Sequence, residues 1–277
     1  MRKPLLVTLL ALLASGCMVG PDYVRPPVET PTAWRLSEQD ARDLANTVWW
    51  EQLGDPVLND LVATALHENK DLMIAAARVD QFAGNYGIVR SGLFPQVGAG
   101  YEVRRQRDVS AVVVGAGGDE TYNSYNAVLN ASWEIDIWGR IRRQTEAARA
   151  QLLASEEGRR GVILSLVGSV AGAYINLRDL DRQLEIARAT AKSRGESYEI
   201  FKLRFEGGII SVLELSQNRS QYEEALATIP PLEKAIAQQE NGLSVLLGRN
   251  PGPIPRGKDI DHLTLPAIPA GLPSDLL

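Results

Sequence analysis

The sequence predicts a mainly α-helical fold in which long coiled-coil helices are interrupted by one antiparallel β-hairpin of membrane-spanning length. Three observations predict it. Apolar residues recur at alternating steps of three and four in the second half, no proline occurs from 139 to 206, and an intervening stretch alternates apolar and polar residues. A period near 3.5 is typical of helices that wind around one another, and a period of two is typical of strands.

Composition argues against several classes of protein. The 277 residues have a formal net charge of −5, and the 29 Lys and Arg residues are scattered, so no nucleic-acid-binding surface is indicated. One cysteine excludes an intramolecular disulfide, and two histidines exclude a histidine-rich metal site. No catalytic triad or phosphate-binding loop occurs at useful spacing. We therefore expect no catalytic residues, no metal site and no cofactor, and a protein that is not an enzyme.

Residues 1–16 are predicted to be a lipoprotein signal peptide. Arg2 and Lys3 precede the apolar run Leu5–Leu13, which is too short to cross a bilayer as a mature helix. Small residues then lead to Cys17, the single cysteine of the chain. We expect cleavage before Cys17 and attachment of lipid to it. The alternative is an ordinary signal peptide with a cysteine there by chance.

Residues 17–48 are predicted to be an extended tether that follows the lipid anchor. Four prolines between positions 21 and 31 disfavour helix in this stretch. Met18 rather than aspartate follows the cysteine, so no signal for retention in the inner membrane is recognised. Several acyl chains on one residue hold a protein stably on a membrane. We therefore expect a protein anchored in the cell outer membrane.

The first helical region is expected at residues 56–92. Asp55-Pro56 is a typical helix start, with aspartate as the N-cap and proline in the first turn. An apolar stripe follows, and Asn69 and Asp71 are expected to break or re-cap the helix.

Two further helices are expected at 139–206 and 210–248. At about 1.5 Å per residue the first would extend roughly 100 Å, which suits a protein that crosses the periplasm. Gly207-Gly208 should end it. Pro230-Pro231 should kink or interrupt the second helix. The Pro-rich residues 250–277 are expected to be an irregular linker.

Two strands are expected at 95–104 and 124–136. Eleven extended residues span roughly 36 Å, and a tilt near 45° reduces this to about 25 Å of membrane thickness. One parity of each strand is apolar and is expected to face lipid. This parity comprises Val97, Ala99, Tyr101, Val103, Tyr125, Ala127, Leu129, Ala131, Trp133 and Ile135. The alternative is a soluble hairpin packed on a core.

Several motifs carry a resemblance that extends over the whole chain. They are the segment Cys17-Met18-Val19-Gly20-Pro21-Asp22-Tyr23, Trp49-Trp50 with Leu53-Gly54-Asp55-Pro56, Phe94-Pro95, Trp133-Glu134-Ile135-Asp136 with Trp138-Gly139, and Leu246-Leu247-Gly248. Together they resemble TolC-type outer-membrane efflux lipoproteins of the NodT class. The resemblance implies a trimer with a twelve-stranded barrel in the outer membrane and a TolC-like periplasmic helical barrel below it.

The resemblance also implies partners. A periplasmic adaptor protein and an inner-membrane pump would dock at the far end of the helical barrel. The turn between the two long helices would be the adaptor-contact tip, formed by Arg204, Gly207, Gly208 and Ser211. The alternative for this turn is a plain connection between two helices.

Residues 49–249 would be one efflux repeat, whereas family members carry two in tandem. The acidic gate belongs to the second repeat in the family, so no gate residue is assigned here. Two strands per chain would give a trimer only six, and even eight leave an interior that side chains fill. We therefore expect that this chain alone forms no open channel unless the second repeat is supplied.

The expected function is that of an outer-membrane channel subunit of a tripartite efflux pump. It would conduct exported small molecules passively from the periplasm to the exterior. Two alternatives remain at this point: a lipid-anchored periplasmic coiled-coil scaffold, and a truncated non-conducting lipoprotein.

Overall fold

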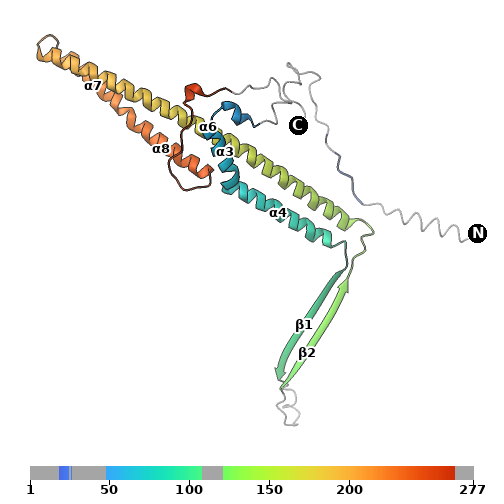
Figure 1. The fold of residues 1–277 in the computed structure, drawn as a ribbon. Coiled ribbons are helices and arrows are strands. Elements are labelled where there is room, and N and C mark those ends of the chain that lie inside the picture. The colour runs from blue at the N-terminus through green and yellow to red at the C-terminus, as the bar shows by residue number, and fades with distance from the viewer. Residues whose placement is uncertain (1–18, 25, 27–47, 108–120, 266–277) are drawn as a thin grey trace, which may run out of the picture. The chain divides into compact units, whose positions relative to one another are not determined.

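The computed structural model describes residues 19–24, 26, 48–107 and 121–265 (Figure 1). The predicted signal peptide, Cys17 and most of the tether lie outside the described residues. The chain forms two compact units, which are described separately. Unit 1 contains residues 1–24 and 77–157, and unit 2 contains residues 25–76 and 158–277.

The described elements confirm the predicted class, with long helices and one antiparallel hairpin. In chain order they are the 3-10 turn η1 (Trp49–Leu53), helices α3 (Pro56–Glu68) and α4 (Lys70–Ser91), strands β1 (Gln96–Arg107) and β2 (Thr121–Ser132), helices α6 (Arg140–Glu206), α7 (Val212–Ala227) and α8 (Ile229–Leu246), and the 3-10 turn η2 (Ile260–His262).

The first helical region is divided at Asn69. The Asp55 carboxylate accepts the backbone N–H of Val57 at 2.9 Å and so caps α3. Asn69 leaves the helical conformation, and its side-chain oxygen accepts the backbone N–H of Leu72 at 2.9 Å. Its amide also donates to the carbonyl of Leu246 at the end of α8, at 2.9 Å. The Asn69 side chain therefore caps the start of α4 and links the break between α3 and α4 to the end of α8.

Helix α6 is one uninterrupted element of 67 residues, close to its expected bounds. Gly139 precedes it with φ 77°, a backbone conformation that glycine adopts without steric cost. Part of α6 is long and apolar enough to cross a membrane by length and composition alone, although 33% of that window is buried. Its buried residues include Val170 and Leu177, which belong to the apolar residues that recur at steps of three and four in this part of the sequence.

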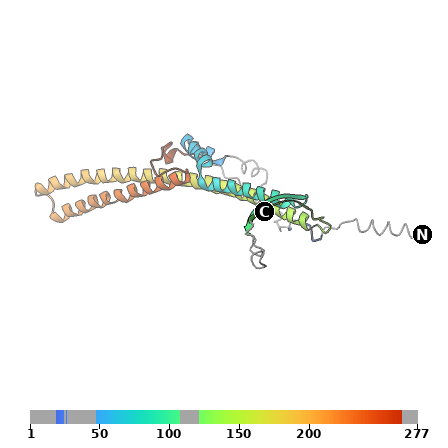
Figure 2. The ribbon, with the colours of Figure 1, turned by 90° about the horizontal axis from the view of Figure 1, so that it is seen from below.

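The helix expected at 210–248 is two helices, separated at Thr228. The break therefore falls two residues before Pro230, and Pro230 occupies the first turn of α8. Proline is tolerated there because an N–H in the first turn has no partner within the helix. Along unit 2, α7 and α8 return antiparallel beside α6 (Figure 2).

The core of unit 2 lies where α3, α6 and α8 meet. Its largest fully buried side chains include Leu58 and Val62 from α3, Tyr174 from α6, and Leu243 from α8. The partly buried Trp49 and Trp50 pack against this cluster from η1, their rings edge to face with centroids 6.2 Å apart. Packing against the neighbouring helices thus accounts for the tryptophan pair.

The segment expected to begin a linker at residue 250 is packed against unit 2. Ile254 is 3% exposed and belongs to the core. The Arg256 guanidinium forms ion pairs with Asp181, at 2.9 Å, and with Glu240. The backbone N–H of Thr264 donates to Leu53 at 3.2 Å. The sequence did not predict this packing of the expected linker. Its contacts are made by isolated side chains and backbone groups, which produce no periodic pattern of apolar residues.

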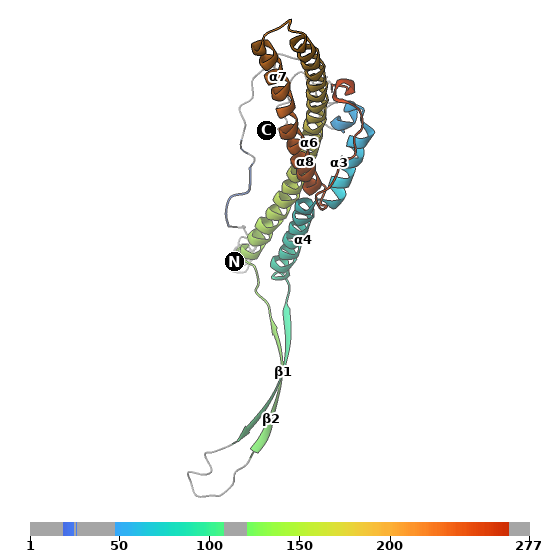
Figure 3. The same ribbon diagram turned by 90° about the vertical axis from the view of Figure 1, so that its left-hand side faces the viewer.

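Strands β1 and β2 form a long twisted hairpin in unit 1 (Figure 3). Its ladder runs in register from Gln96 opposite Ser132 to Arg107 opposite Thr121. The strands extend three residues further toward the connecting loop than expected. At the other end β2 stops at Ser132 rather than 136, so two residues expected to face lipid from a strand, Trp133 and Ile135, lie beyond it.

Candidate membrane hairpin and helix-turn tip

The register of the hairpin brings the apolar parities of both strands onto one face. Residues directly opposite each other in an antiparallel ladder project to the same side. The apolar pairs are Val97 with Ala131, Ala99 with Leu129, Tyr101 with Ala127, and Val103 with Tyr125. A slip of one residue would have placed the two parities on opposite faces. The structure therefore joins eight of the ten expected positions into one apolar surface, which we call the apolar face.

The apolar face is uncovered in the described part of the chain. Leu129 is 78% exposed, Val97 71% and Tyr101 69%. Apolar surface that no described residue covers needs a partner, either lipid or another protein surface. This exposure argues against the alternative of a hairpin packed on its own core.

The opposite face of the hairpin is largely polar. It carries Asn130 opposite Gly98, and Glu102 opposite Asn126. Glu102 pairs with the exposed Arg104 at 2.7 Å. A side chain at position 98 would collide with the Asn130 amide, so glycine leaves that amide its space. Alternation between an apolar and a polar face is the pattern of a barrel strand between lipid and a water-filled interior.

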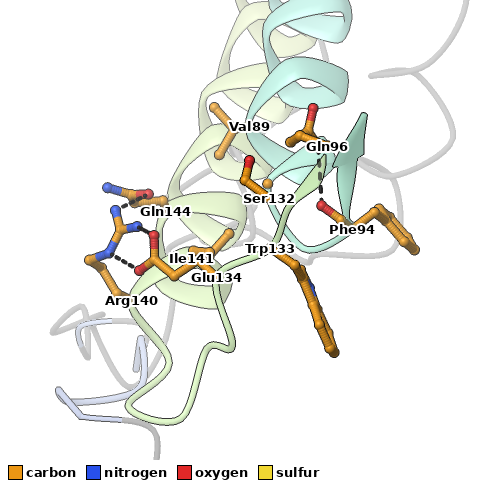
Figure 4. Close-up of a pocket in the computed structure, with 10 residues that line it drawn as sticks. Val89, Phe94, Gln96, Ser132, Trp133, Glu134, Arg140, Ile141 and Gln144 are labelled. Atoms are coloured by element: carbon orange, nitrogen blue, oxygen red, sulfur yellow. Dashed lines mark hydrogen bonds and ion pairs between the residues drawn. The ribbon is translucent and has the colours of Figure 1, made fainter. Parts of the chain in front are cut away.

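The base of the hairpin is connected to α6 by charged side chains (Figure 4). Arg140 donates from Nε and Nη2 to the two carboxylate oxygens of Glu134, at 3.1 and 2.6 Å. The exposed rings of Phe94 and Trp133 point away from this ion pair. The Trp133 indole N–H donates to the carbonyl of Leu93 at 3.2 Å, which helps to turn the chain out of β2.

Asp136 caps the start of α6. Its carboxylate accepts the backbone N–H groups of Ile141 and Arg142, at 3.1 and 2.9 Å. Partial burial raises the pKa of Asp136, but these hydrogen bonds and the Arg142 guanidinium together hold that pKa below its ordinary value. A charged carboxylate at a helix N-terminus is also favoured by the helix dipole. The strand therefore gives way to a cap at Asp136, which explains why β2 ends early.

The turn between α6 and α7 brings the four expected tip residues together. Gly208 adopts φ 71°, its N–H donates to Phe205, and the N–H of Ile209 donates to the carbonyl of Arg204, each at 2.9 Å. This is the hydrogen-bond pattern of a glycine-terminated helix end. Gly207 N–H donates to Leu203 at 3.0 Å. The backbone of this turn is thus held by hydrogen bonds rather than left free.

Ser211 starts α7 through a reciprocal cap. Its hydroxyl accepts the N–H of Glu214 at 3.3 Å, and its own N–H donates to the Glu214 carboxylate at 2.8 Å. Serine followed three residues later by glutamate is the sequence signature of this arrangement. The role of Ser211 in the turn is therefore structural.

Apolar side chains at the tip were missed in the sequence. Ile209 is 75% exposed, and Leu203, Val212 and Leu213 are each more than 60% exposed. The Arg204 guanidinium lies 5.7 Å from the ring centroid of Phe201. The sequence signal that could have indicated them is a cluster of aliphatic residues beside two glycines, at positions that do not belong to the buried side of the helices. The tip thus offers apolar contact area beside a positive charge.

The paired helices behind the tip are held by specific contacts. Tyr198 on α6 stacks on Tyr222 of α7, with ring centroids 6.1 Å apart. Gly195 makes room for that ring, because a Cβ there would lie 3.0 Å from it. Arg194 interrupts the recurrence of apolar residues at steps of three and four along α6, and it donates to Gln221 at 2.7 Å. The interruption is therefore a contact between helices.

Comparison with known proteins now places this chain in a family. The family model described as "Outer membrane efflux protein" matches residues 61–249. The toluene efflux pump outer membrane protein TtgC of Pseudomonas putida is 35% identical over all of this chain and 59% of its own length. The probable outer membrane lipoprotein SilC of Salmonella typhimurium is 31% identical over 89% of this chain and 53% of its own length. A crystal structure of CusC, described as forming a transmembrane channel, has a TM-score of 0.74 and 29% identity over 92% of this chain and 57% of that one.

The long helices and the antiparallel hairpin define the TolC-like fold of outer-membrane efflux proteins. The chain belongs to the outer membrane efflux protein family, as the motifs predicted. It spans a little over half the length of the relatives it matches. The predicted localisation in the cell outer membrane is likewise confirmed by these relatives.

Proposed function

We propose that this chain supplies strands and helices to an outer-membrane channel that conducts exported small molecules passively from the periplasm to the exterior, without catalysis. The observation that carries the proposal is the apolar face, because the ladder aligns both apolar parities on one uncovered side. Relatives named for toluene efflux and for cation efflux support an export role.

The hairpin requires further strands to function in a membrane. Among the described residues the sheet has two strands, so each has one unpaired edge. Unpaired N–H and C=O groups are too costly in hydrocarbon, so a membrane sheet must close into a barrel. We propose that other copies of the chain, together with a second repeat, supply the missing strands of a trimeric barrel.

The helices would line the periplasmic part of the conduit. Antiparallel pairing of α6 with α7 and α8 supports this assignment, since Arg188 pairs with Glu233 at 2.7 Å and Gln239 donates to the carbonyl of Ala173 at 2.8 Å. The exposed aliphatic side chains of the tip would contact a periplasmic adaptor, which connects the channel to an inner-membrane pump. The lipid on Cys17 would anchor each subunit.

Two arginine substitutions test the membrane placement of the hairpin. Leu129 lies on the apolar face, and its neighbour Asn130 lies on the polar face of the same strand. Leu129→Arg should destabilise the inserted barrel by about 2–4 kcal/mol if that site is near the midplane of the bilayer. Asn130→Arg should cost much less, because that side chain would face water.

The measurement is the amount of assembled oligomer recovered from outer membranes by gel electrophoresis without heating, together with resistance of cells to exported compounds. Leu129→Arg should lower both and Asn130→Arg neither. Equal recovery of the two variants would argue against a barrel strand and favour a periplasmic scaffold.

A further inference from the structure

Arg143, near the start of α6, binds the peptide that follows the predicted lipid anchor. Its Nη2 donates to the carbonyl of Gly20 and to the carboxylate of Asp22, both at 2.8 Å. Its Nε donates to the carbonyl of Val19 at 3.4 Å. Its Nη1 donates to Glu146 at 2.7 Å, which orients the guanidinium from the other side. We call these contacts the Arg143 clamp, and all of them lie within unit 1.

The clamp depends on guanidinium geometry more than on charge. The Asp22 side chain is 82% exposed, and an exposed ion pair alone contributes little. The carbonyl contacts add donors in a fixed plane, which a lysine ammonium cannot reproduce. Gly20 turns the chain over the guanidinium with φ 112°, a conformation that residues with a side chain rarely adopt. The peptide after Cys17 is therefore shaped to receive this arginine.

The clamped peptide lies beside an exposed apolar loop at the foot of the hairpin. The backbone N–H of Val19 donates to the carbonyl of Trp138 at 3.3 Å. Trp138 is 72% exposed, and Trp133, Ile135 and Ile137 are each more than half exposed. Tryptophan next to aliphatic side chains is typical of surfaces that sit at the level of lipid headgroups.

Chain connectivity limits how far a lipid on Cys17 could lie from Val19. Cys17 is two residues before Val19, and two extended residues span about 7 Å at most. Acyl chains on Cys17 would therefore enter the bilayer beside the exposed tryptophans. We therefore infer that the exposed apolar side chains of this loop contact the same lipid layer that receives the anchor.

We propose that Arg143 is a positioning residue that seats the lipid anchor. The peptide 19–22 and the loop 133–138 form one surface at the headgroup level of the periplasmic leaflet of the outer membrane, with the acyl chains of Cys17 inserted beside it. On this proposal the tether predicted at residues 17–48 starts after residue 22, and the clamp sets the lateral position of the anchor relative to the hairpin. This inference rests on the proposed membrane function of the hairpin and on acylation of Cys17.

A spin label on the full chain tests the clamp. Tyr23 is 81% exposed, so Tyr23→Cys accepts a label with little disturbance, and acylated Cys17 does not react. The mobility of the label is measured from its spectrum in otherwise unchanged protein and in the variants Arg143→Ala, Arg143→Lys, Asp22→Ala and Arg149→Ala. The last is the control, because Arg149 is an exposed arginine further along α6.

We expect the label to shift from slow to fast motion on the nanosecond timescale with Arg143→Ala, and partly with Arg143→Lys and Asp22→Ala. Arg149→Ala should leave the spectrum unchanged. Asp22→Ala leaves α6 intact, so a mobile label in that variant is not an effect of helix unfolding. Accessibility of the label to oxygen, a lipid-phase probe, should fall with Arg143→Ala.

Mass spectrometry of the N-terminal peptide separates failure of this inference from failure of the proposed function. Acylated Cys17 with equal label mobility in Arg143→Ala and the parent protein would overturn the clamp and leave the channel role intact. Unmodified Cys17 would overturn both the anchor and its seating, whereas the Leu129 and Asn130 variants still decide the membrane role of the hairpin.

Discussion

The hydroxyl of Tyr174 on α6 donates a 2.7 Å hydrogen bond to the carboxylate of Asp55, which caps α3. The same carboxylate accepts the backbone N–H of Lys258 at 3.0 Å, and the Tyr174 oxygen accepts the N–H of Gly257 at 2.9 Å. One buried carboxylate therefore connects α3, α6 and the segment after α8. This junction gives a physical reason for the Leu53-Gly54-Asp55-Pro56 motif.

Removal of the Tyr174 hydroxyl should destabilise unit 2. Tyr174→Phe leaves the Gly257 N–H without its acceptor and removes one of the two donors to a buried oxygen of Asp55, which should lower the free energy of unfolding by about 1–3 kcal/mol. Chemical denaturation of the purified protein followed by circular dichroism measures it. Tyr198→Phe is the control, because that ring stacks on Tyr222 and keeps its contact. An equal effect of the two changes would contradict the role of the junction.

The same hydroxyl should make stability depend on alkaline pH. Burial, followed by the bond to Asp55, raises the pKa of Tyr174 from 10.0 to about 12. The folded state thus favours the neutral hydroxyl, so its contribution is complete below pH 10 and is lost as pH rises toward 12. The free energy of unfolding should fall more steeply over this range in the parent protein than in Tyr174→Phe. Parallel curves would show that the hydroxyl is not linked to folding.

Gly257 should tolerate no side chain. A Cβ there would overlap the Asp55 carboxylate, so Gly257→Ala should cost about 1–3 kcal/mol, the usual range for overpacking. Gly242 on α8 is exposed and has open space around its Cα. Gly242→Ala should therefore be neutral or stabilising by up to about 1 kcal/mol. Thermal unfolding of both variants checks the opposite signs, and a neutral Gly257→Ala would refute the close packing.

Contact between the tip and an adaptor should be detectable by crosslinking in cells. Ser211 is a poor site because it caps α7, whereas Ile209 is 75% exposed and its side chain makes none of the hydrogen bonds of the turn. Ile209→Cys should crosslink to the periplasmic adaptor. Leu153→Cys, at an exposed position of α6 in unit 1, is the control. Crosslinking from Leu153 but not from Ile209 would contradict the assignment of the tip.

Local patterns determined the elements that the sequence predicted well. The expected helix 139–206 is observed as Arg140–Glu206, because a sustained heptad-like period and the terminal glycines act within a few residues of one another. The four expected tip residues fall in one turn for the same reason. Each strand's apolar parity was likewise readable, since alternation needs only neighbouring residues.

The sequence by itself therefore determined the helices, the strand parities and the family, through signals carried by nearby residues. Only the tertiary structure decided the hairpin register, the Asp55–Tyr174 junction, the packing of Ile254 and the Arg143 clamp. The junction joins residues 119 apart, and Arg143 reaches Asp22 across 121 positions. Such contacts involve single side chains and backbone groups that folding brings together. No hydrophobic periodicity, capping motif or turn motif in the sequence predicts them.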